Sequence, residues 1–189
     1  MTLKSLIAIA WVLSAPVFAQ WQIDADASSL HFVSTKNAQV IEVHRFDALS
    51  GSLDKSGKLS VKVPLDSVNT NIEIRDTRMQ EKLFEVAKFP HATFTAQVPE
   101  PLMNVESGKV IQGEVRGTLE LHGKQAPATF NVSVARNDTM MTVTTVSPTV
   151  IDANAFDLGQ GVEVLKEIAS LSSITLSVPV TFSVTFTQQ

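Results

Sequence analysis

The chain has 189 residues, of which 19 are acidic and 15 are basic, and its net charge is −4. A negative net charge without a basic face argues against nucleic-acid binding. The chain has no cysteine, which excludes disulfides, thiol catalysis and cysteine-ligated metals.

The first segment has the features of an export signal. Lys4 precedes an apolar run over residues 6–13, and Val17-Phe18-Ala19 provides small or apolar residues before a cut after Ala19. The run is too short to span a bilayer, which takes about 20 residues. We predict a cleavable signal over residues 1–19 and one domain over residues 20–189, with no stable membrane insertion. A retained anchor is the alternative.

Apolar and polar residues alternate through the next part of the chain. Leu30 and Phe32, residues 39–53 and residues 59–65 follow this pattern. A period of two is typical of strands that bury one face.

A helical pattern replaces the alternation after residue 70. Ile72, Met79 and Leu83 recur at helical spacing, Asn71 could cap the start, and Pro90 would end the helix.

Arg75 and Arg78 are three residues apart in this helix and therefore project to the same side. Two interpretations of this pair are possible. The guanidinium groups could hold a phosphate or carboxylate head group. Alternatively, which we favour, ion pairs through Asp76 or Glu81 attach the helix to its neighbours.

Strand patterns return in the second half. Residues 92–98 alternate, residues 118–122 and 128–134 flank a hairpin turn at His122-Gly123, and residues 140–146 add another strand. A second amphipathic helix carries Val162, Leu165 and Ile168. The longest alternation follows it.

That last alternation covers residues 174–186 and would make a strand suited to wrapping around a barrel. Short connections between about eight strands favour an up-and-down meander that closes on itself. We predict an all-β fold, an antiparallel lipocalin-like up-and-down barrel of about eight strands with two short helical insertions.

Motifs of common enzymes are missing. There is no nucleophile elbow, zinc-protease motif, phosphate-binding loop or dinucleotide fingerprint. We therefore expect no enzyme, no catalytic residue and no cofactor. Strand pairing could bring His31 and His44 together as metal ligands, but we favour isolated histidines and predict no metal site.

A series of short motifs runs through nearly the whole predicted domain. They are Trp21-Gln22-Ile23-Asp24, Ser28-Ser29-Leu30-His31-Phe32, Leu65-Asp66-Ser67-Val68-Asn69-Thr70, Ile74-Arg75-Asp76-Thr77-Arg78-Met79, Lys88-Phe89-Pro90-His91-Ala92-Thr93-Phe94 and Leu121-His122-Gly123. In combination they resemble the YceI-like family of polyisoprenoid-binding, lipocalin-like proteins.

This resemblance implies a periplasmic eight-stranded barrel with a long hydrophobic cavity. It also implies long-chain amphipathic ligands, isoprenoid quinones and polyprenyl phosphates among them. The chain departs from the family at residues 33–37, where many members have a histidine, and from Asn154 to the last strand. No family motif specifies the ligand.

The candidate cavity residues follow from alternation and helical spacing. They are Phe32, Phe46, Leu65, Met79, Leu83, Phe94, Leu119, Phe130 and Phe182. Arg75 and Arg78 complete the candidate ligand-binding set.

We predict a periplasmic binding or carrier protein that holds a long-chain apolar or isoprenoid lipid of the quinone or polyprenyl phosphate type. One alternative is a lipid-modifying enzyme with Arg75, Arg78 or His44 near the head group. Another is a stress-related interaction module with a filled barrel, which a cavity no larger than about 300 Å³ would favour. The oligomeric state stays open, a homodimer included.

Overall fold

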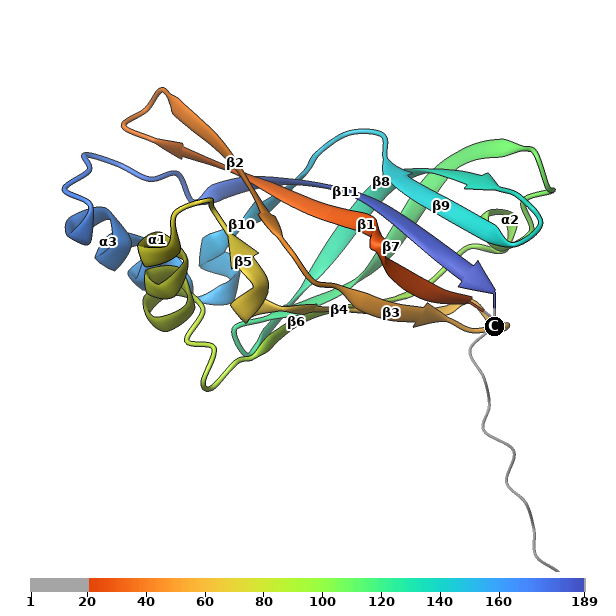
Figure 1. The fold of residues 1–189 in the computed structure, drawn as a ribbon, viewed down its shortest axis with the longest axis horizontal. Helices are drawn as coiled ribbons and strands as arrows, with labels where there is room; N and C mark the ends of the chain where they lie inside the picture. The colour runs from red at the N-terminus through yellow and green to blue at the C-terminus, as the bar shows by residue number, and fades with distance from the viewer. Residues whose placement is uncertain (1–20, 189) are drawn as a thin grey trace, which may run out of the picture.

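The sheet closes into a barrel (Figure 1). The apolar side chains of its strands form a core inside the barrel. The computed structural model describes residues 21–188. The predicted export signal lies outside the described residues. Within them, all strand pairs are antiparallel.

The described residues form eleven strands. They are β1 (Trp21–Lys36), β2 (Val40–Phe46), β3 (Ser50–Leu53), β4 (Lys58–Pro64), β5 (Val68–Asn69), β6 (His91–Gln97), β7 (Val110–Leu121), β8 (Lys124–Arg136), β9 (Met140–Thr145), β10 (Thr149–Asp152) and β11 (Ser177–Gln188).

Eight of these strands form a closed ring in the order β1, β3, β4, β6, β7, β8, β9 and β11, and β11 pairs with β1. At two places in the ring, a long strand pairs along one edge with two shorter strands. Both β2 and β3 pair with β1, at opposite ends of it, and both β9 and β10 pair with β11. The predicted eight-stranded up-and-down barrel is therefore confirmed.

The predicted central hairpin is the β7–β8 pair. Only His122 and Gly123 separate the two strands, and both have positive φ, 52° and 73°. Positive φ at both central residues is the geometry of a type I′ turn, whose twist matches that of the strands.

The last strand begins later than predicted. β11 starts at Ser177, and Ile174 makes only an isolated bridge with Lys36. Residues 170–176 instead connect the preceding helix to the barrel. Ile174 still packs in the core at that end, so its place in the alternation reflects burial and not strand pairing.

Both predicted helical insertions are present, and three further short helical segments were missed. The helical segments are η1 (Leu65–Ser67), α1 (Glu73–Arg78), the π-helical η2 (Met79–Leu83), α2 (Glu100–Met103), η3 (Ala153–Phe156) and α3 (Gly159–Ile168).

The predicted limits of the first helix are wrong. Ile72 occupies the N-cap position without a side-chain cap, and Asn71 has a φ of 60° and instead accepts a hydrogen bond from Arg45. The helical segment ends at Leu83, well before Pro90, and Glu85 follows it with positive φ.

Helices α1 and α3 close one end of the barrel, and α2 lies at the other end (Figure 1). One apolar cluster fills the barrel and includes Phe130 and Phe186. A second apolar cluster lies under η2 and α3, with Met79 and Leu83 from η2 and Val162 from α3. Gly161 makes this contact close, because a Cβ there would lie 2.8 Å from the Lys82 carbonyl oxygen and 2.9 Å from the Leu83 Cα.

We expect Gly161→Ala to destabilise the protein by about 1–2 kcal/mol, since the added methyl group meets backbone atoms and overpacks the contact. Urea unfolding followed by circular dichroism measures the change. Gly159→Ala is the matched control, because its Cβ would meet only the terminal oxygen of the Asn154 side chain. Equal stability of the two variants would contradict the close packing.

Candidate functional site

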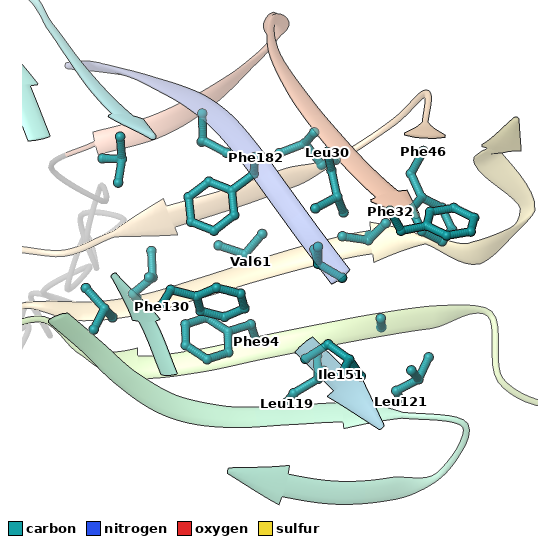
Figure 2. A pocket seen from close by; sticks show the side chains of 18 of the residues that line it. Leu30, Phe32, Phe46, Val61, Phe94, Leu119, Leu121, Phe130, Ile151 and Phe182 are labelled. Carbon is teal, nitrogen blue, oxygen red and sulfur yellow. The ribbon is translucent and has the colours of Figure 1, made fainter. Parts of the chain in front are cut away.

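The barrel encloses a cavity of about 280 Å³ whose lining residues are all apolar (Figure 2). All eight strands of the closed ring contribute side chains to it, as do η2 and α3. The lining includes members of both apolar clusters. The apolar surface is therefore continuous from the barrel interior to the helices.

Three phenylalanine rings meet in the middle of the barrel (Figure 2). Phe94 and Phe130 lie edge to face with ring centres 5.1 Å apart, and Phe130 and Phe182 lie 5.4 Å apart. They come from β6, β8 and β11. These rings fill much of the space there.

The structure places all nine apolar candidates around the cavity. They are Phe32, Phe46, Leu65, Met79, Leu83, Phe94, Leu119, Phe130 and Phe182. That these residues contact a lipid stays a prediction. Arg75 and Arg78 are not among the lining residues.

The volume lies at the lower limit for small-molecule sites, which range upward from about 300 Å³. Judged by volume alone, the cavity falls just short of the size that would distinguish a ligand site from a filled barrel. The chemistry and continuity of the lining, and not the volume, are the features that distinguish this cavity from a packing defect.

Several lining residues were missed in the sequence. Leu158 and Val162 belong to the helical end, and Leu102 comes from α2, which seals the other end against Gly113. The apolar stripe of α3 was a usable signal for Val162. Leu102 lies in a four-residue helix that is too short to give a periodic pattern.

The inward face of the β1–β2 hairpin changes from apolar to polar along its length. Leu30 and Phe46 are cross-strand partners and line the cavity. The next pair on the same face is Phe32 and His44, and the pair after that is Ser34 and Glu42. Polar groups therefore follow the cavity directly at the helical end.

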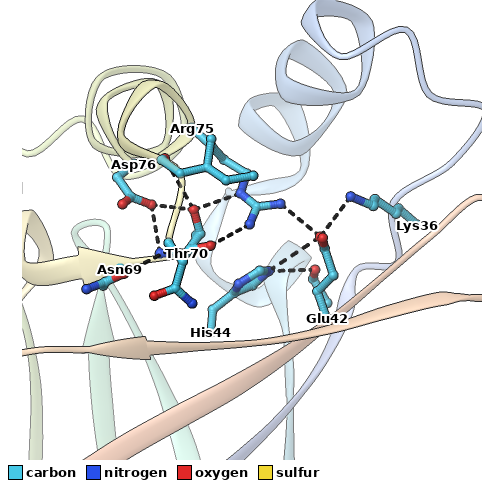
Figure 3. A network of polar contacts seen from close by, with 10 residues as sticks. Lys36, Glu42, His44, Asn69, Thr70, Arg75 and Asp76 are labelled. Carbon is cyan, nitrogen blue, oxygen red and sulfur yellow. Dashed lines mark hydrogen bonds and ion pairs between the residues drawn. The ribbon is translucent and has the colours of Figure 1, made fainter.

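Glu42 is the centre of a polar network between this hairpin and α1 (Figure 3). Its carboxylate lies 2.8 Å from the Lys36 ammonium and 2.8 Å from Arg75 Nη1. The hydrogen bond from Lys36 is the largest cause of the lowered pKa of Glu42; burial opposes it, and the charges of Arg75 and Lys36 lower the pKa further.

Arg75 is held by the protein through all three guanidinium nitrogens. Besides the Glu42 contact, Nε donates to Thr70 Oγ1 and Nη2 donates to the Thr70 carbonyl oxygen, each over 2.7 Å. Asp76 accepts hydrogen bonds from the Thr70 amide and hydroxyl.

The structure shows the ion pair that we favoured for Arg75 over head-group binding. Its partner is Glu42, however, and not the predicted Asp76 or Glu81. The sequence did not indicate Glu42, because its position opposite α1 depends on the pairing of β2 with β1. Within residues 21–188, no carboxylate lies within ion-pair distance of Arg78.

His44 is buried next to this network, with 5% of its surface exposed. Its Nε2 lies 3.1 Å from Ser34 Oγ, and its ring packs against the Phe32 ring at 5.2 Å. Its Nδ1 is buried without a hydrogen-bond partner, an arrangement that costs about 1–3 kcal/mol. Burial and the charge of Arg75 lower the pKa of His44, so the ring is neutral at neutral pH.

Metal ligands do not gather in the described residues, in which no group of three or more His, Asp or Glu side chains is placed to hold an ion. His31 and His44 lie on adjacent strands as predicted, but His31 is opposite Arg45 and His44 is opposite Phe32. The two histidines therefore project from opposite faces. None of the helices in residues 21–188 is long and apolar enough to cross a membrane.

Comparison with protein families gives one match over nearly all the described residues. A YceI-like domain model matches residues 21–186. A search of curated proteins found no match.

Two solved structures share the architecture. A polyisoprenoid binding domain from Saccharophagus degradans, implicated in plant cell wall breakdown, is 36% identical, with a TM-score of 0.87 over 91% of this chain and 100% of that chain. BcnA from Burkholderia cenocepacia is 22% identical, with a TM-score of 0.66 over 86% of this chain and 98% of that chain. The second likeness shows the fold alone.

We expect Arg75→Met to destabilise the protein by about 2 kcal/mol, because it removes three charge-assisted hydrogen bonds. Arg78→Met removes the same charge without such bonds and should change the free energy of unfolding by less than about 0.5 kcal/mol. Urea unfolding of both variants measures the difference. Similar losses would show that the Arg75 network contributes little.

The pKa of His44 predicts a pH dependence. In the folded protein the pKa of His44 lies below its ordinary value of 6.5. The unfolded chain therefore binds the proton more readily, and the free energy of unfolding falls as the pH drops below about 6.5. Between pH 7 and about 5.5, wild-type protein should therefore lose more stability than His44→Gln. Urea unfolding at the two pH values measures this, and equal losses would exclude His44 as the group responsible.

Proposed function

The chain belongs to the YceI-like family, and we propose that it is a periplasmic binding or carrier protein for a long-chain isoprenoid lipid of the quinone or polyprenyl phosphate type. The observation that carries the proposal is the exclusively apolar lining along the barrel. This lining is continuous from the barrel interior to the helices, so a long tail would meet one apolar surface along its length.

Apolar contact is sufficient to drive such binding. Each methylene that leaves water contributes about 0.8 kcal/mol, and an isoprenoid tail brings many of them into the barrel. The lining has no charged group that would reject a tail. Affinity therefore comes mainly from tail length, with little discrimination between tails.

The observed volume of about 280 Å³ is small for a long tail. Binding therefore requires the barrel to widen, and the rings of Phe94, Phe130 and Phe182 are the side chains that occupy its middle. Turning these rings along the wall would lengthen the free space without exposing a polar group.

Family membership supports the ligand class. The Saccharophagus degradans relative is described as a polyisoprenoid binding domain, and the identity extends over 91% of this chain. The predicted export signal supports the location, an aqueous compartment between membranes in which an apolar molecule needs a container.

The test is native mass spectrometry of the full chain, expressed with its own signal segment in a Gram-negative host and recovered from the periplasm. We expect a protein that begins at Gln20 and carries about one lipid, which is released intact. A chain that keeps residues 1–19, or a protein that stays empty when offered a prenylated quinone and a polyprenyl phosphate, would contradict the proposal. A lipid converted to another compound would instead support the enzyme alternative.

The cavity itself is tested by Val61→Trp, which places a large ring in the middle of the barrel (Figure 2). We expect lipid affinity to fall more than about tenfold, because the tail loses buried methylenes. Thr95→Trp is the matched control. Thr95 is exposed on the strand next to Val61 and alternates with Phe94, so its side chain points outward. Equal binding by both variants would exclude the barrel interior as the site.

A further inference from the structure

Nδ1 of His44 is the only buried side-chain nitrogen or oxygen in residues 21–188 that lacks a hydrogen-bond partner. Nearly all buried polar groups in folded proteins have one, so an exception calls for a specific explanation. The position of His44 in the barrel provides it.

His44 is not itself among the residues that line the cavity, but it lies between those residues and the polar network. On β2 it stands between Phe46, which lines the cavity, and Glu42, the centre of the network. Its ring packs against Phe32, which also lines the cavity. A lipid whose tail fills the barrel would therefore bring its polar end to this histidine.

We propose that His44 Nδ1 binds the head group of the lipid, and that this head group is uncharged and forms hydrogen bonds, as a hydroxyl, carbonyl or amide does. The inference rests on the proposed function, because it assumes a tail in the barrel. Since the Phe32 ring packs against His44 in this structure, binding includes a rotation of that ring.

The charges around His44 argue against a phosphate. Every guanidinium nitrogen of Arg75 already donates to Glu42 or Thr70, and Lys36 is paired with Glu42. A phosphate would have to displace these partners and would also meet the Glu42 carboxylate, which lies 3.9 Å from His44 Nε2. An uncharged group leaves the network intact.

A neutral imidazole suits such a group. If Ser34 donates to Nε2, then Nδ1 carries the proton and donates to the ligand; if Nε2 donates to Ser34, then Nδ1 accepts from it. A hydroxyl can form a hydrogen bond with Nδ1 in either tautomer, since it both donates and accepts. The lowered pKa of His44 keeps the ring neutral.

The two ring nitrogens can be tested separately. His44→Gln keeps a polar group near the position of Nε2 but removes Nδ1, whereas His44→Asn keeps one near Nδ1. His31→Leu is the matched control, because His31 alternates with Leu30 and Phe32, which line the cavity, and so faces outward. Binding is measured by titration calorimetry with geranylgeraniol, geranylgeranyl phosphate and the hydrocarbon phytane, each delivered from cyclodextrin.

We expect wild-type protein and His31→Leu to bind geranylgeraniol about tenfold more tightly than phytane or the phosphate, as for one buried hydrogen bond. His44→Gln should lose this preference while its affinity for phytane stays unchanged, which also shows that its cavity is intact. His44→Asn should keep most of the preference.

These measurements separate a failure of the head-group inference from a failure of the proposed function. If phytane and geranylgeraniol bind equally, or if His44→Gln keeps the preference, the head-group inference is wrong and the proposed binding of tails stands. If the phosphate binds most tightly and Arg78→Met weakens it, the head group is anionic and the inference is overturned. If none of the three compounds binds, the proposed function fails and the inference fails with it.

Discussion

The antiparallel pairing of β1 with β11 makes this sheet a barrel. It joins the first and last strands and closes the sheet, so that the ring has no open edge along these two strands. A chain without cysteine has no disulfide to hold its ends together, and these ladder hydrogen bonds do so instead. Closure also turns eight separate apolar faces into one enclosed surface. The cavity is a consequence of that closure.

The helical end depends on closure in a second way. Segments far apart in the chain, η2 and α3, meet over the barrel because the strands that precede them end at the same side. Their contact is close enough to require glycine at position 161. The polar network and His44 then occupy the space between this end and the β1–β2 hairpin. The barrel therefore has an apolar interior and one chemically distinct end, which is the arrangement that an amphipathic molecule requires.

Much of the fold was predictable because it depends on local patterns. Alternation identified most of the strands, although it missed β10 and the first part of β7. The sequence His122-Gly123 identified the hairpin, since its backbone conformation follows from the residues themselves. The strand residues among the nine apolar cavity candidates also follow from alternation, because side chains of one strand face share one environment after closure, whereas Met79 and Leu83 follow from helical spacing. Prediction also failed elsewhere. The helix around Leu102 is too short to be periodic, and residues 174–176 continue the alternation of the last strand but belong to the connection between α3 and β11.

Alternation, helical spacing and short connections are set by residues close together in the chain, so the strands, the two larger helices, the meander and the apolar character of its inward face could be predicted from them. The surroundings of the charged and polar groups depend instead on contacts between distant segments. Arg75 pairs with Glu42 across 33 positions of sequence, and His44 is buried with one nitrogen unpaired. The strand register sets such contacts, and a shift of one residue would turn Glu42 and His44 outward. The burial of His44, its pKa and its place at the end of the cavity are therefore properties of the closed barrel.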